Sequence, residues 1–355
     1  MSVGVGVLGA GWIAAAHVDG IRRVGGTRVV AIAATSQARA DSRAAEMDIP
    51  RAYVGWQDLL EDADVQVVHN ATPTPLHAEI NAAIISAGKH VVSDKPLTVT
   101  SAESAALLQQ ARQAGIVHAV TFNHRGFRSV HQMRAMIASG DIGTLHAIRG
   151  AYLQGWLIDP AAGNWRVQET RISGTLLDIG SHWFDLCEWA TGERVASVLA
   201  DLQQLQPSRG GAEGGSVLVR FASGARGSCM ISQAATGRGN RLTLEAYGSR
   251  GALIWSSQTP DELLRLPAVG ASAETLFGDP AAVPRSANLY SKAPPRHPEA
   301  WPDAWRNILA PVYATINGQP TAGDYPTFEA GLRNAQVLEA VQRSHNDERW
   351  TAVSG

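Results

Sequence analysis

The residues best suited to do chemistry lie in one stretch near the middle of the chain, residues 175–185. Two carboxylates, Asp178 and Asp185, and one imidazole, His182, stand there among apolar residues. If the stretch is helical, side chains three and four positions apart share a face, so His182 lies beside both carboxylates. A half-buried imidazole next to carboxylates can move a proton near neutral pH. A helix with a surface salt bridge has the same pattern, so the rest of the sequence must decide.

The length and charge of the chain limit the classes of protein to which it can belong. Its 355 residues are too many for one typical core, so we expect two domains. Hydrophobic residues make up 45% and charged residues 17%, as in soluble globular proteins. The formal net charge of −2 gives no support to nucleic acid or an anionic membrane as a partner.

The first residues and the cysteines indicate the compartment. The chain begins with a strand pattern and lacks the basic start of a secretory signal, and none of its apolar runs is long enough to span a membrane. Cys187 and Cys229 lie far apart and lack the spacing of a metal site. We therefore expect a reduced, cytoplasmic protein with neither a structural disulfide nor a metal ion.

A glycine-rich motif, G-x-G-x-x-A, directly follows the first predicted strand (residues 3–8) and opens a helix. Gly9 permits a tight turn, Gly11 lets the backbone approach a pyrophosphate, and Ala14 lets helix and strand pack closely. The N–H groups and the dipole at the helix start favour phosphates. A purely structural turn is the alternative, but the position at the head of a βαβ pattern favours a dinucleotide.

The end of the second predicted strand (residues 28–34) bears on the choice of cofactor. An NAD-preferring fold usually places an acid there, about 20 residues after the glycines, to bind the ribose 2′-hydroxyl. Here Thr35, Ser36 and Arg39 follow the strand, and no carboxylate does. Two hydroxyls and a guanidinium can hold a 2′-phosphate, which favours NADP slightly over NAD. Alternatively, Arg39 only solvates a helix face.

Polar residues also follow two later predicted strands, residues 65–69 and 90–93. In an open α/β sheet, ligands bind beyond the carboxyl ends of the strands. The residues placed there are Thr72, Pro73, Asp94 and Lys95. The pattern predicts a Rossmann dinucleotide-binding domain over residues 1–122.

From residue 123 the pattern changes to short alternating strands joined by turns rich in glycine. The expected strands are residues 145–152, 195–205, 216–221, 225–232 and 242–247. Such a run predicts a large, mainly antiparallel open sheet. Residues 266–302 are expected to form an ordered loop, and residues 327–344 a final helix. The predicted fold class is α/β, a Rossmann domain followed by an α+β domain over residues 123–355.

With these motifs the chain resembles the Gfo/Idh/MocA oxidoreductases, named after glucose–fructose oxidoreductase and inositol dehydrogenase. The resemblance covers nearly the whole length, and four motifs carry it. They are Gly9-Ala10-Gly11-Trp12-Ile13-Ala14 with His17, Ala71-Thr72-Pro73 with His77, Asp94-Lys95-Pro96, and Asp178-Ile179-Gly180-Ser181-His182-Trp183-Phe184-Asp185. The resemblance implies that Lys95, Asp178 and His182 surround the reacting carbon. It also implies a homodimer or homotetramer, assembled through the open sheet.

Two departures from the family pattern matter. The usual E-K-P is Asp94-Lys95-Pro96 here. Because the side chain of Asp94 is shorter than that of Glu, a contact that it makes with the cofactor would be placed differently. The second strand also lacks the acid that NAD-using members have, so Thr35, Ser36 and Arg39 are more similar to NADP-using members.

The motifs together predict hydride transfer between a nicotinamide and the secondary alcohol of a sugar or polyol. Lys95 is expected to stabilise the developing alkoxide, His182 to act as general base, and Asp178 to orient the imidazole or hold a hydroxyl. Expected cofactor contacts are Gly9, Ala10, Gly11, Trp12, Ile13, Thr35, Ser36, Arg39, Ala71, Thr72, Pro73, His77, Asp94, Lys95 and Asn123. Expected substrate contacts are Lys95, Arg125, Tyr152, Trp156, Trp165, Arg166, Asp178 and His182.

Two other functions remain open on the same fold. One is a non-catalytic dinucleotide-binding regulator, because fold alone does not fix function. The other is a glycoside hydrolase that uses a bound nicotinamide for transient oxidation and elimination. The intact set of Lys95, Asp178 and His182 speaks against the regulator, and the sequence offers no added base for the hydrolase.

Overall fold

The computed structural model describes residues 2–163, 167, 171–270, 272–278, 292–294, 297–319 and 324–355. Their internal contacts divide the chain into two compact units. The first unit holds the chain up to Gly126 and the later segment Trp301–Leu332, and the second holds the chain from Phe127 onward and the last segment, Arg333–Gly355. The chain therefore leaves the first unit, returns to it and leaves it again.

The first unit is built on a parallel sheet of six strands within the described residues, in the order β3-β2-β1-β4-β5-β6. The strands are β1 (Val3–Leu8), β2 (Thr27–Ala34), β3 (Arg51–Val54), β4 (Val67–Asn70), β5 (His90–Ser93) and β6 (His118–Val120). The order reverses between β1 and β4, and in such sheets the ligand crevice lies at this point, beyond the carboxyl ends. The predicted Rossmann fold is confirmed.

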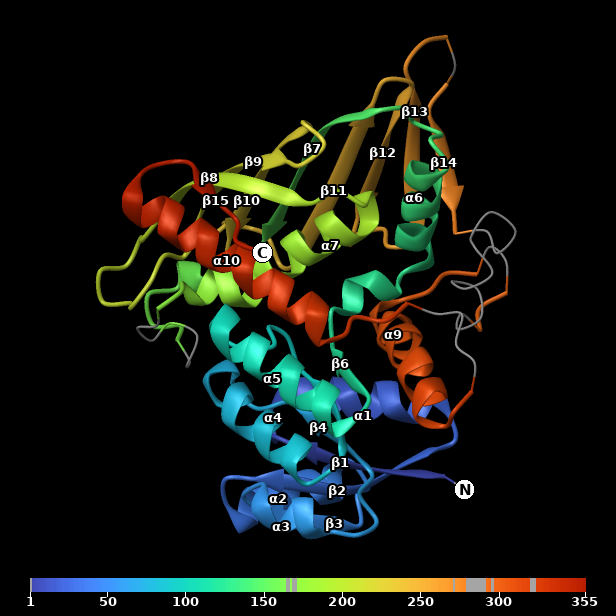
Figure 1. Cartoon of the computed structure of the whole chain (residues 1–355), viewed down its shortest axis with the longest axis vertical. Helices are drawn as coiled ribbons and strands as arrows, with labels where there is room; N and C mark the ends of the chain where they lie inside the picture. The colour runs from blue at the N-terminus through green and yellow to red at the C-terminus, as the bar shows by residue number, and fades with distance from the viewer. Residues whose placement is uncertain are drawn as a thin grey trace. The chain divides into compact units, whose positions relative to one another are not determined.

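Helices cover both faces of this sheet and create two separate cores (Figure 1). The helices are α1 (Trp12–Val24), α2 (Gln37–Glu46), α3 (Gln57–Glu61), α4 (His77–Ser86), α5 (Ser101–Ala114) and α9 (Trp301–Ile316). Side chains of α1, α2 and α9 pack on one face, whereas α3, α4 and α5 pack on the other. The strands are buried on both sides, which explains their nearly continuous apolar sequence.

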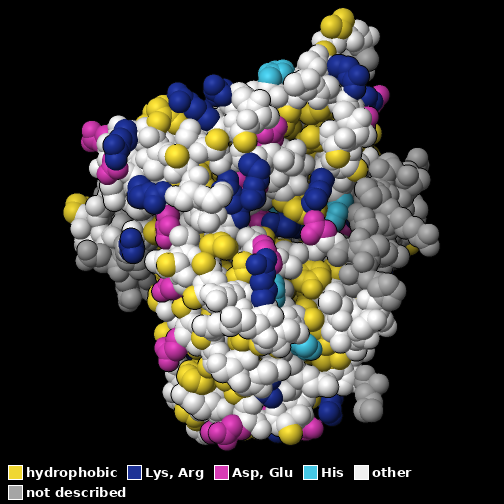
Figure 2. Space-filling model, viewed as in Figure 1, with side chains coloured by type: hydrophobic (Ala, Val, Ile, Leu, Met, Phe, Trp, Pro, Cys, Tyr) yellow, Lys and Arg dark blue, Asp and Glu magenta, His cyan; other side chains and the backbone are white. Residues whose placement is uncertain are grey.

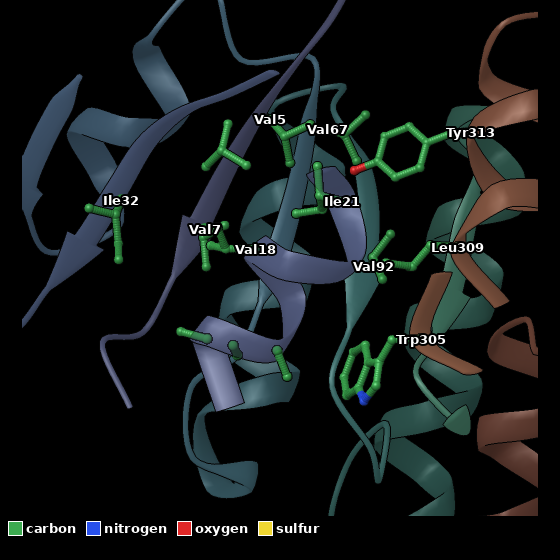
Figure 3. Packing of buried hydrophobic residues seen from close by; sticks show 14 of the residues in the cluster. Val5, Val7, Val18, Ile21, Ile32, Val67, Val92, Trp305, Leu309 and Tyr313 are labelled. Carbon is green, nitrogen blue, oxygen red and sulfur yellow. The ribbon is translucent and has the colours of Figure 1, made fainter. Parts of the chain in front are cut away.

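Helix α9 joins the first unit although it lies far along the chain. Figure 3 shows Trp305, Leu309 and Tyr313 of α9 against residues of α1 and the sheet. The close approach depends on Gly20, where a Cβ atom would lie 3.0 Å from Cδ1 of Leu309. The observed division therefore differs from the expected 1–122 and 123–355, because residues 301–332 bury their apolar side chains in the first unit.

The second unit is built on a sheet of nine strands within the described residues, in the order β14-β13-β12-β11-β7-β10-β9-β8-β15. The strands are β7 (Leu145–Leu153), β8 (Val195–Gln203), β9 (Gly214–Phe221), β10 (Arg226–Ser232), β11 (Arg241–Gly248), β12 (Gly251–Ser256), β13 (Glu262–Pro267), β14 (Glu274–Phe277) and β15 (Thr351–Ala352). All neighbours are antiparallel except β7 and β10. The predicted large, mainly antiparallel sheet is confirmed, but its strands β12, β13, β14 and β15 were not predicted. Strand β14 lies within residues 266–302, where we expected only a loop.

Helices of the second unit pack on one face of this sheet. They are α6 (Arg128–Ala138), a π-helical turn (Leu176–Gly180), α7 (Ser181–Thr191) and most of α10 (Phe328–Asp347). On β9, Val217, Val219 and Phe221 are buried, whereas Leu218 and Arg220 between them are exposed. One face of β9 therefore belongs to the core and the other is open to solvent.

The surface mixes charges of both signs. Figure 2 shows Lys and Arg side chains interspersed with Asp and Glu over the visible face, in line with the net charge of −2. Within the described residues, none of the helices has both the length and the apolar composition needed to cross a bilayer.

Candidate active site

The glycine-rich loop between β1 and α1 has the geometry of an anion site. Gly9 has a φ of 104°, and a Cβ there would lie 2.5 Å from the carbonyl oxygen of Ala71, so only glycine fits the turn. Gly11 caps α1, and a Cβ there would meet nothing within 4 Å. Ala14 is fully buried against the sheet. The loop therefore presents open backbone and a helix N-terminus, as phosphate binding requires.

Two arginines reach this loop from α2. Nη2 of Arg39 lies 3.5 Å from the carbonyl oxygen of Ala10, and Nη2 of Arg43 lies 3.2 Å from that of Gly11. Thr35, Ser36 and Arg39 are all exposed. Of the predicted 2′-phosphate residues, the structure thus brings Arg39 to the glycine-rich loop, and it adds Arg43, which the sequence reading missed.

The ends of β4 and β5 are tied together by side-chain amides and a histidine. Oδ1 of Asn70 accepts a hydrogen bond of 2.6 Å from the hydroxyl of Thr72. The two ring nitrogens of His77 lie 2.8 Å from the carbonyl oxygen of Thr72 and 2.9 Å from that of Pro96. Burial lowers the pKa of His77, although the charge of Asp94 and the backbone carbonyls oppose that effect. His77 therefore links the loop after β4 to the loop that carries Lys95.

Asp94 lies 8% exposed at the end of β5, beside half-buried Lys95. Its Oδ1 accepts a hydrogen bond of 2.6 Å from Thr121 and lies 3.6 Å from Nε2 of His17. Burial alone would raise the pKa of Asp94, but His17, the charge of Lys95 and the Thr121 hydroxyl hold it far below its usual value. Asp94 is therefore a carboxylate, and it can hold the ammonium of Lys95 in place.

His124, which the sequence reading missed, lies 5% exposed in the turn after β6. Burial and the charge of Lys95 lower the pKa of His124 to about 3, so the ring stays neutral. The feature of the sequence that could have indicated His124 is its position just beyond the end of β6. The neighbouring Arg125, an expected substrate contact, holds its guanidinium carbon 5.9 Å from the centre of the Phe122 ring.

Two observations test whether a dinucleotide suits this sheet edge. The space at Gly11 is open. Nδ2 of Asn123 is buried and has no hydrogen-bond partner within the described residues. This donor, near the loop of Lys95, is therefore available for an acceptor atom of a cofactor. Trp12, 67% exposed, stacks on Trp301 with 6.4 Å between the ring centres. Of the other expected contacts, Ile13 is half-buried, Ala71 is buried and Pro73 is exposed. The residues present fit the cofactor.

In the second unit, the stretch that carries Asp178 and His182 is not one regular α-helix. Residues 176–180 form a π-helical turn, and α7 begins only at Ser181. In a π turn the bonded residues are five apart, so the α-helical spacing expected for Asp178 and His182 is wrong. His182 and Asp185 are buried and Asp178 is half-buried. The ring of His182 lies 5.9 Å from that of Tyr152, between ring centres.

A network of amides fixes Asp178. Nε2 of Gln233 donates to Oδ2 of Asp178 over 2.7 Å, and Oε1 of Gln233 accepts from the hydroxyl of Thr175 over 3.0 Å. Gln233 is 1% exposed, so its amide is shielded from water. Sequence reading missed Gln233, because nothing in its local pattern shows that β10 leads it to the π turn.

Gln154 extends this network to two expected substrate contacts. Its Oε1 accepts 3.1 Å hydrogen bonds from Trp156 and from Gln233. Burial raises the pKa of Tyr152 above its ordinary value, and the charge of Asp178 adds to the effect. The phenol is therefore a neutral hydrogen-bonding group. The remaining expected substrate contacts, Trp165 and Arg166, lie outside the described residues.

Each unit thus gathers one set of the predicted residues. The first set lies at the carboxyl ends of the parallel strands and can bind a dinucleotide and supply an ammonium. The second set combines a carboxylate, an imidazole and aromatic rings, which suit the hydroxyl groups and the apolar side of a sugar. Among the described residues, no group of three or more His, Cys, Asp or Glu is arranged to hold a metal ion.

Two family models match successive parts of the chain. The model described as "Oxidoreductase family, NAD-binding Rossmann fold" matches residues 3–122, and that described as "GFO/IDH/MocA C-terminal domain" matches residues 130–254. The fold and these matches define an oxidoreductase with an NAD-binding Rossmann domain. The chain belongs to the Gfo/Idh/MocA family, as its motifs predicted.

Named relatives of the chain include dehydrogenases of levoglucosan and of myo-inositol. Levoglucosan dehydrogenase of Pseudarthrobacter phenanthrenivorans is 32% identical over 333 residues, which cover 84% of this chain and 82% of the relative. Myo-inositol 2-dehydrogenase of Thermotoga maritima is 28% identical over 255 residues, 70% of this chain and 74% of the relative. A structure of levoglucosan dehydrogenase in complex with NADH and levoglucosan matches over 100% of both chains, with a TM-score of 0.91 and 28% identity.

Proposed function

We propose that the protein is a nicotinamide-dependent dehydrogenase for a secondary alcohol, or the matching ketone, of a sugar, polyol or sugar derivative. The observation that carries this proposal is the polar cluster at the carboxyl end of β5. There the charge of Lys95 acts on a buried carboxylate, Asp94, and on a buried neutral imidazole, His124, at the sheet edge that also holds the open glycine-rich loop. The sugar and polyol dehydrogenases among the relatives support the substrate class.

In this proposal the two residue sets act on one substrate. A bound nicotinamide supplies the hydride acceptor for alcohol oxidation. Lys95 donates a hydrogen bond to the alcohol oxygen and stabilises the negative charge that develops on it. The His182 imidazole accepts the alcohol proton, because its ordinary pKa lies near neutral pH. Asp178, held by Gln233, is oriented to accept a hydrogen bond from a neighbouring hydroxyl.

We also propose that the protein prefers NADP. The end of β2 offers Thr35, Ser36 and Arg39, and no carboxylate lies between Ala34 and Arg39 to bind a ribose 2′-hydroxyl. Arg39 reaches the carbonyl oxygen of Ala10, so its guanidinium stands beside the glycine-rich loop. A guanidinium recognises phosphate with two parallel hydrogen bonds, whereas it gains less from a hydroxyl. The NADH complex of the relative shows that members of this family also use NAD.

We further propose that the protein forms a homodimer or homotetramer through the open face of its large sheet. Leu218 on β9 and Met230 on β10 are 49% and 48% exposed on this face. Their strands are neighbours, and the register pairs Leu218 with Ser228 and Met230 with Ser216, which makes the two apolar side chains diagonal neighbours. A second copy of the sheet would bury both.

A panel of sugars and polyols, assayed with NAD and with NADP by nicotinamide absorbance, tests the proposal. We expect turnover with net change in absorbance for at least one substrate. Binding without turnover would indicate the dinucleotide-binding regulator, and release of an aglycone without net absorbance change would indicate the glycoside hydrolase.

The variant Lys95→Met tests the central residue. It removes the ammonium and keeps a long side chain, so we expect kcat to fall by about 100-fold or more while cofactor affinity stays within about threefold. Exposed Lys292, on the second unit, offers a matched control: Lys292→Met should leave both values unchanged. Near-normal turnover by Lys95→Met would remove this residue from the chemistry.

A further inference from the structure

A buried pair of arginine and glutamate lies in the connection between β8 and β9, in the second unit. Nη1 of Arg209 lies 3.1 Å from Oε1 of Glu213, and the two side chains are 5% and 1% exposed. The carboxylate of Glu213 also accepts hydrogen bonds from the backbone N–H groups of Leu205, over 2.6 Å, and Gln206, over 3.3 Å. The pair therefore holds its own connection in one conformation. Neither charged residue belongs to a motif recognised in the sequence.

The other hydrogen bonds of Arg209 hold the turn that follows Trp156. Nη1 donates over 2.8 Å to the carbonyl oxygen of Leu157. Nη2 donates over 2.7 Å to the carbonyl oxygen of Asp159 and over 3.1 Å to that of Ala162. One planar guanidinium thus binds three carbonyl groups of a single turn, which leaves the turn little conformational freedom.

The same connection also holds the chain that leads into the π turn. The backbone N–H of Gly210 donates over 3.0 Å to the carbonyl oxygen of Val167. The hydroxyl of Ser173 donates over 2.8 Å to the carbonyl oxygen of Ala212. Residues 209–213 therefore contact the chain both after the expected substrate contact on the turn and before the π turn.

Backbone hydrogen bonds connect the pair to the amide that holds Asp178. The N–H of Gln233 donates over 2.8 Å to the carbonyl oxygen of Glu213, and the carbonyl oxygen of Gln233 accepts over 2.9 Å from the N–H of Leu157. Leu157 is thus held at its N–H by Gln233 and at its carbonyl group by the arginine. The side chain of Gln233 donates to Asp178. The position of Trp156, which precedes Leu157, is therefore linked to that of the carboxylate.

Stability alone does not explain an ion pair in this buried place. The cost of removing two charges from water offsets most of their attraction, so apolar side chains of similar volume often stabilise a protein equally well. An apolar side chain cannot donate hydrogen bonds to three carbonyl groups, however, and a guanidinium does so in a fixed plane. The function of the pair is therefore to fix a geometry.

We propose that Arg209 is a positioning residue for the sugar. Paired with Glu213, it fixes the turn at residues 157–162. The Trp156 ring and the Asp178 carboxylate then keep a constant separation. A sugar can place its apolar face on the ring and a hydroxyl on the carboxylate without first ordering either side chain. The role toward the sugar rests on the proposed dehydrogenase function, whereas the fixing of the turn does not.

The variant Arg209→Lys tests the fixing of the turn without any substrate. It keeps a positive charge beside Glu213, so the protein should fold, but an ammonium lacks the planar fork that binds the three carbonyl groups. We expect the backbone amides of residues 157–162 to exchange hydrogen at least about tenfold faster than in the unmodified protein, as measured by mass spectrometry. Arg265→Lys is the matched control, because Arg265 pairs with Glu274 on the exposed surface of the same unit. It should leave these amides unchanged.

Turnover and cofactor binding give the second readout. The KM of Arg209→Lys for the sugar should rise about tenfold, because binding must then order the turn and the Trp156 ring. We expect kcat to stay within about threefold, and the affinity for the nicotinamide cofactor, measured by titration calorimetry, within about twofold. A pair that only stabilised the fold would leave KM unchanged in the folded variant.

Two results would overturn the proposal. One is unchanged exchange of residues 157–162 in Arg209→Lys, and the other is faster exchange with an unchanged KM. A loss of cofactor affinity as large as the rise in KM would also contradict it, because it would indicate a general disturbance of the protein. If no sugar reacts with the unmodified protein, the proposed dehydrogenase function fails and the role toward the sugar fails with it. The exchange rates then still decide whether Arg209 fixes the turn.

Discussion

Lys95 stands among titratable groups that respond to its charge. Its charge helps to hold Asp94 ionised and His124 neutral, so three titratable groups share one end of β5 and β6. A group that responds to a neighbouring charge in a buried place is a marker of a functional site. His124 is therefore part of the candidate site although no motif named it.

The pKa of His124 predicts how the stability of the protein depends on pH. The pKa is about 3 in the folded protein and 6.5 in an ordinary histidine, so between these values only the unfolded chain binds the proton. We expect this residue to lower the free energy of unfolding by up to ~1.4 kcal/mol per pH unit as the pH falls from about 6.5. Denaturant unfolding at several pH values measures this slope.

The variant His124→Asn isolates the contribution of this ring. The free energy of unfolding of this variant should fall less steeply with falling pH than that of the unmodified protein, and the difference in slope should correspond to about one proton. His69 and the other buried histidines contribute to the slope in both proteins. Equal slopes in the two proteins would show that His124 has the same pKa in the folded and the unfolded state, which would contradict the prediction.

The position of Arg39 leads to a prediction about the affinity of the protein for NADP relative to NAD. Loss of a guanidinium that pairs with a 2′-phosphate removes a charge-assisted hydrogen bond of about 1.5–3 kcal/mol, so Arg39→Ala should weaken NADP about 10- to 100-fold. NAD should bind as before. Arg23→Ala is a suitable control, because Arg23 pairs with Asp19 on the exposed side of α1. Titration calorimetry with both cofactors measures the difference; equal affinity of the unmodified protein for both would end the argument.

At the scale of elements, short-range rules predicted most of the first unit. The glycine-rich motif with Gly9, Gly11 and Ala14 correctly indicated the turn and the helix after β1. The polar residues that follow β4 and β5 lie at the carboxyl ends of these strands, as predicted. What the sequence did not show depends on contacts between distant segments. Helix α9 gives no local sign that it packs on α1, and Gln233 reaches Asp178 only because β10 leads it there.

The π turn at residues 176–180 could not be predicted for a different reason. Its residues are acceptable in an α-helix, and a single extra residue in one turn leaves no periodic signal. The turn changes which side chains share a face, so the roles expected for Asp178 and His182 must be argued from their own contacts.

The packing of helix α9 leads us to expect that its buried Trp305 contributes strongly to the stability of the protein. Trp305 is 2% exposed in the core between α1 and α9, so Trp305→Ala should cost about 3–5 kcal/mol. Trp301, one turn earlier and 37% exposed, is the matched control, and Trp301→Ala should cost much less. Urea unfolding gives both values. A loss in Trp305→Ala no larger than the small one expected for Trp301→Ala would show that α9 contributes little to this core.

At the scale of the whole molecule, the open sheet face predicts how copies assemble. Met230→Glu places a charge on that face, and we expect it to shift a dimer or tetramer toward the monomer, because a charge buried without a partner is costly. Leu205→Glu is the control: Leu205 is 44% exposed but lies in the loop after β8. Light scattering coupled to gel filtration reports the mass, and an unchanged assembly in Met230→Glu would exclude this face.

The late return of the chain to its first unit has a consequence for synthesis on the ribosome. Residues of the first core, such as Leu309 and Tyr313, are made almost 200 residues after Gly126. At roughly 5–20 residues per second, the part of the first unit made before Gly126 waits roughly 10–40 s with the apolar stripe of α1 uncovered. Nascent chains stalled before and after α9 emerges should therefore differ in protease resistance and in their demand for chaperones.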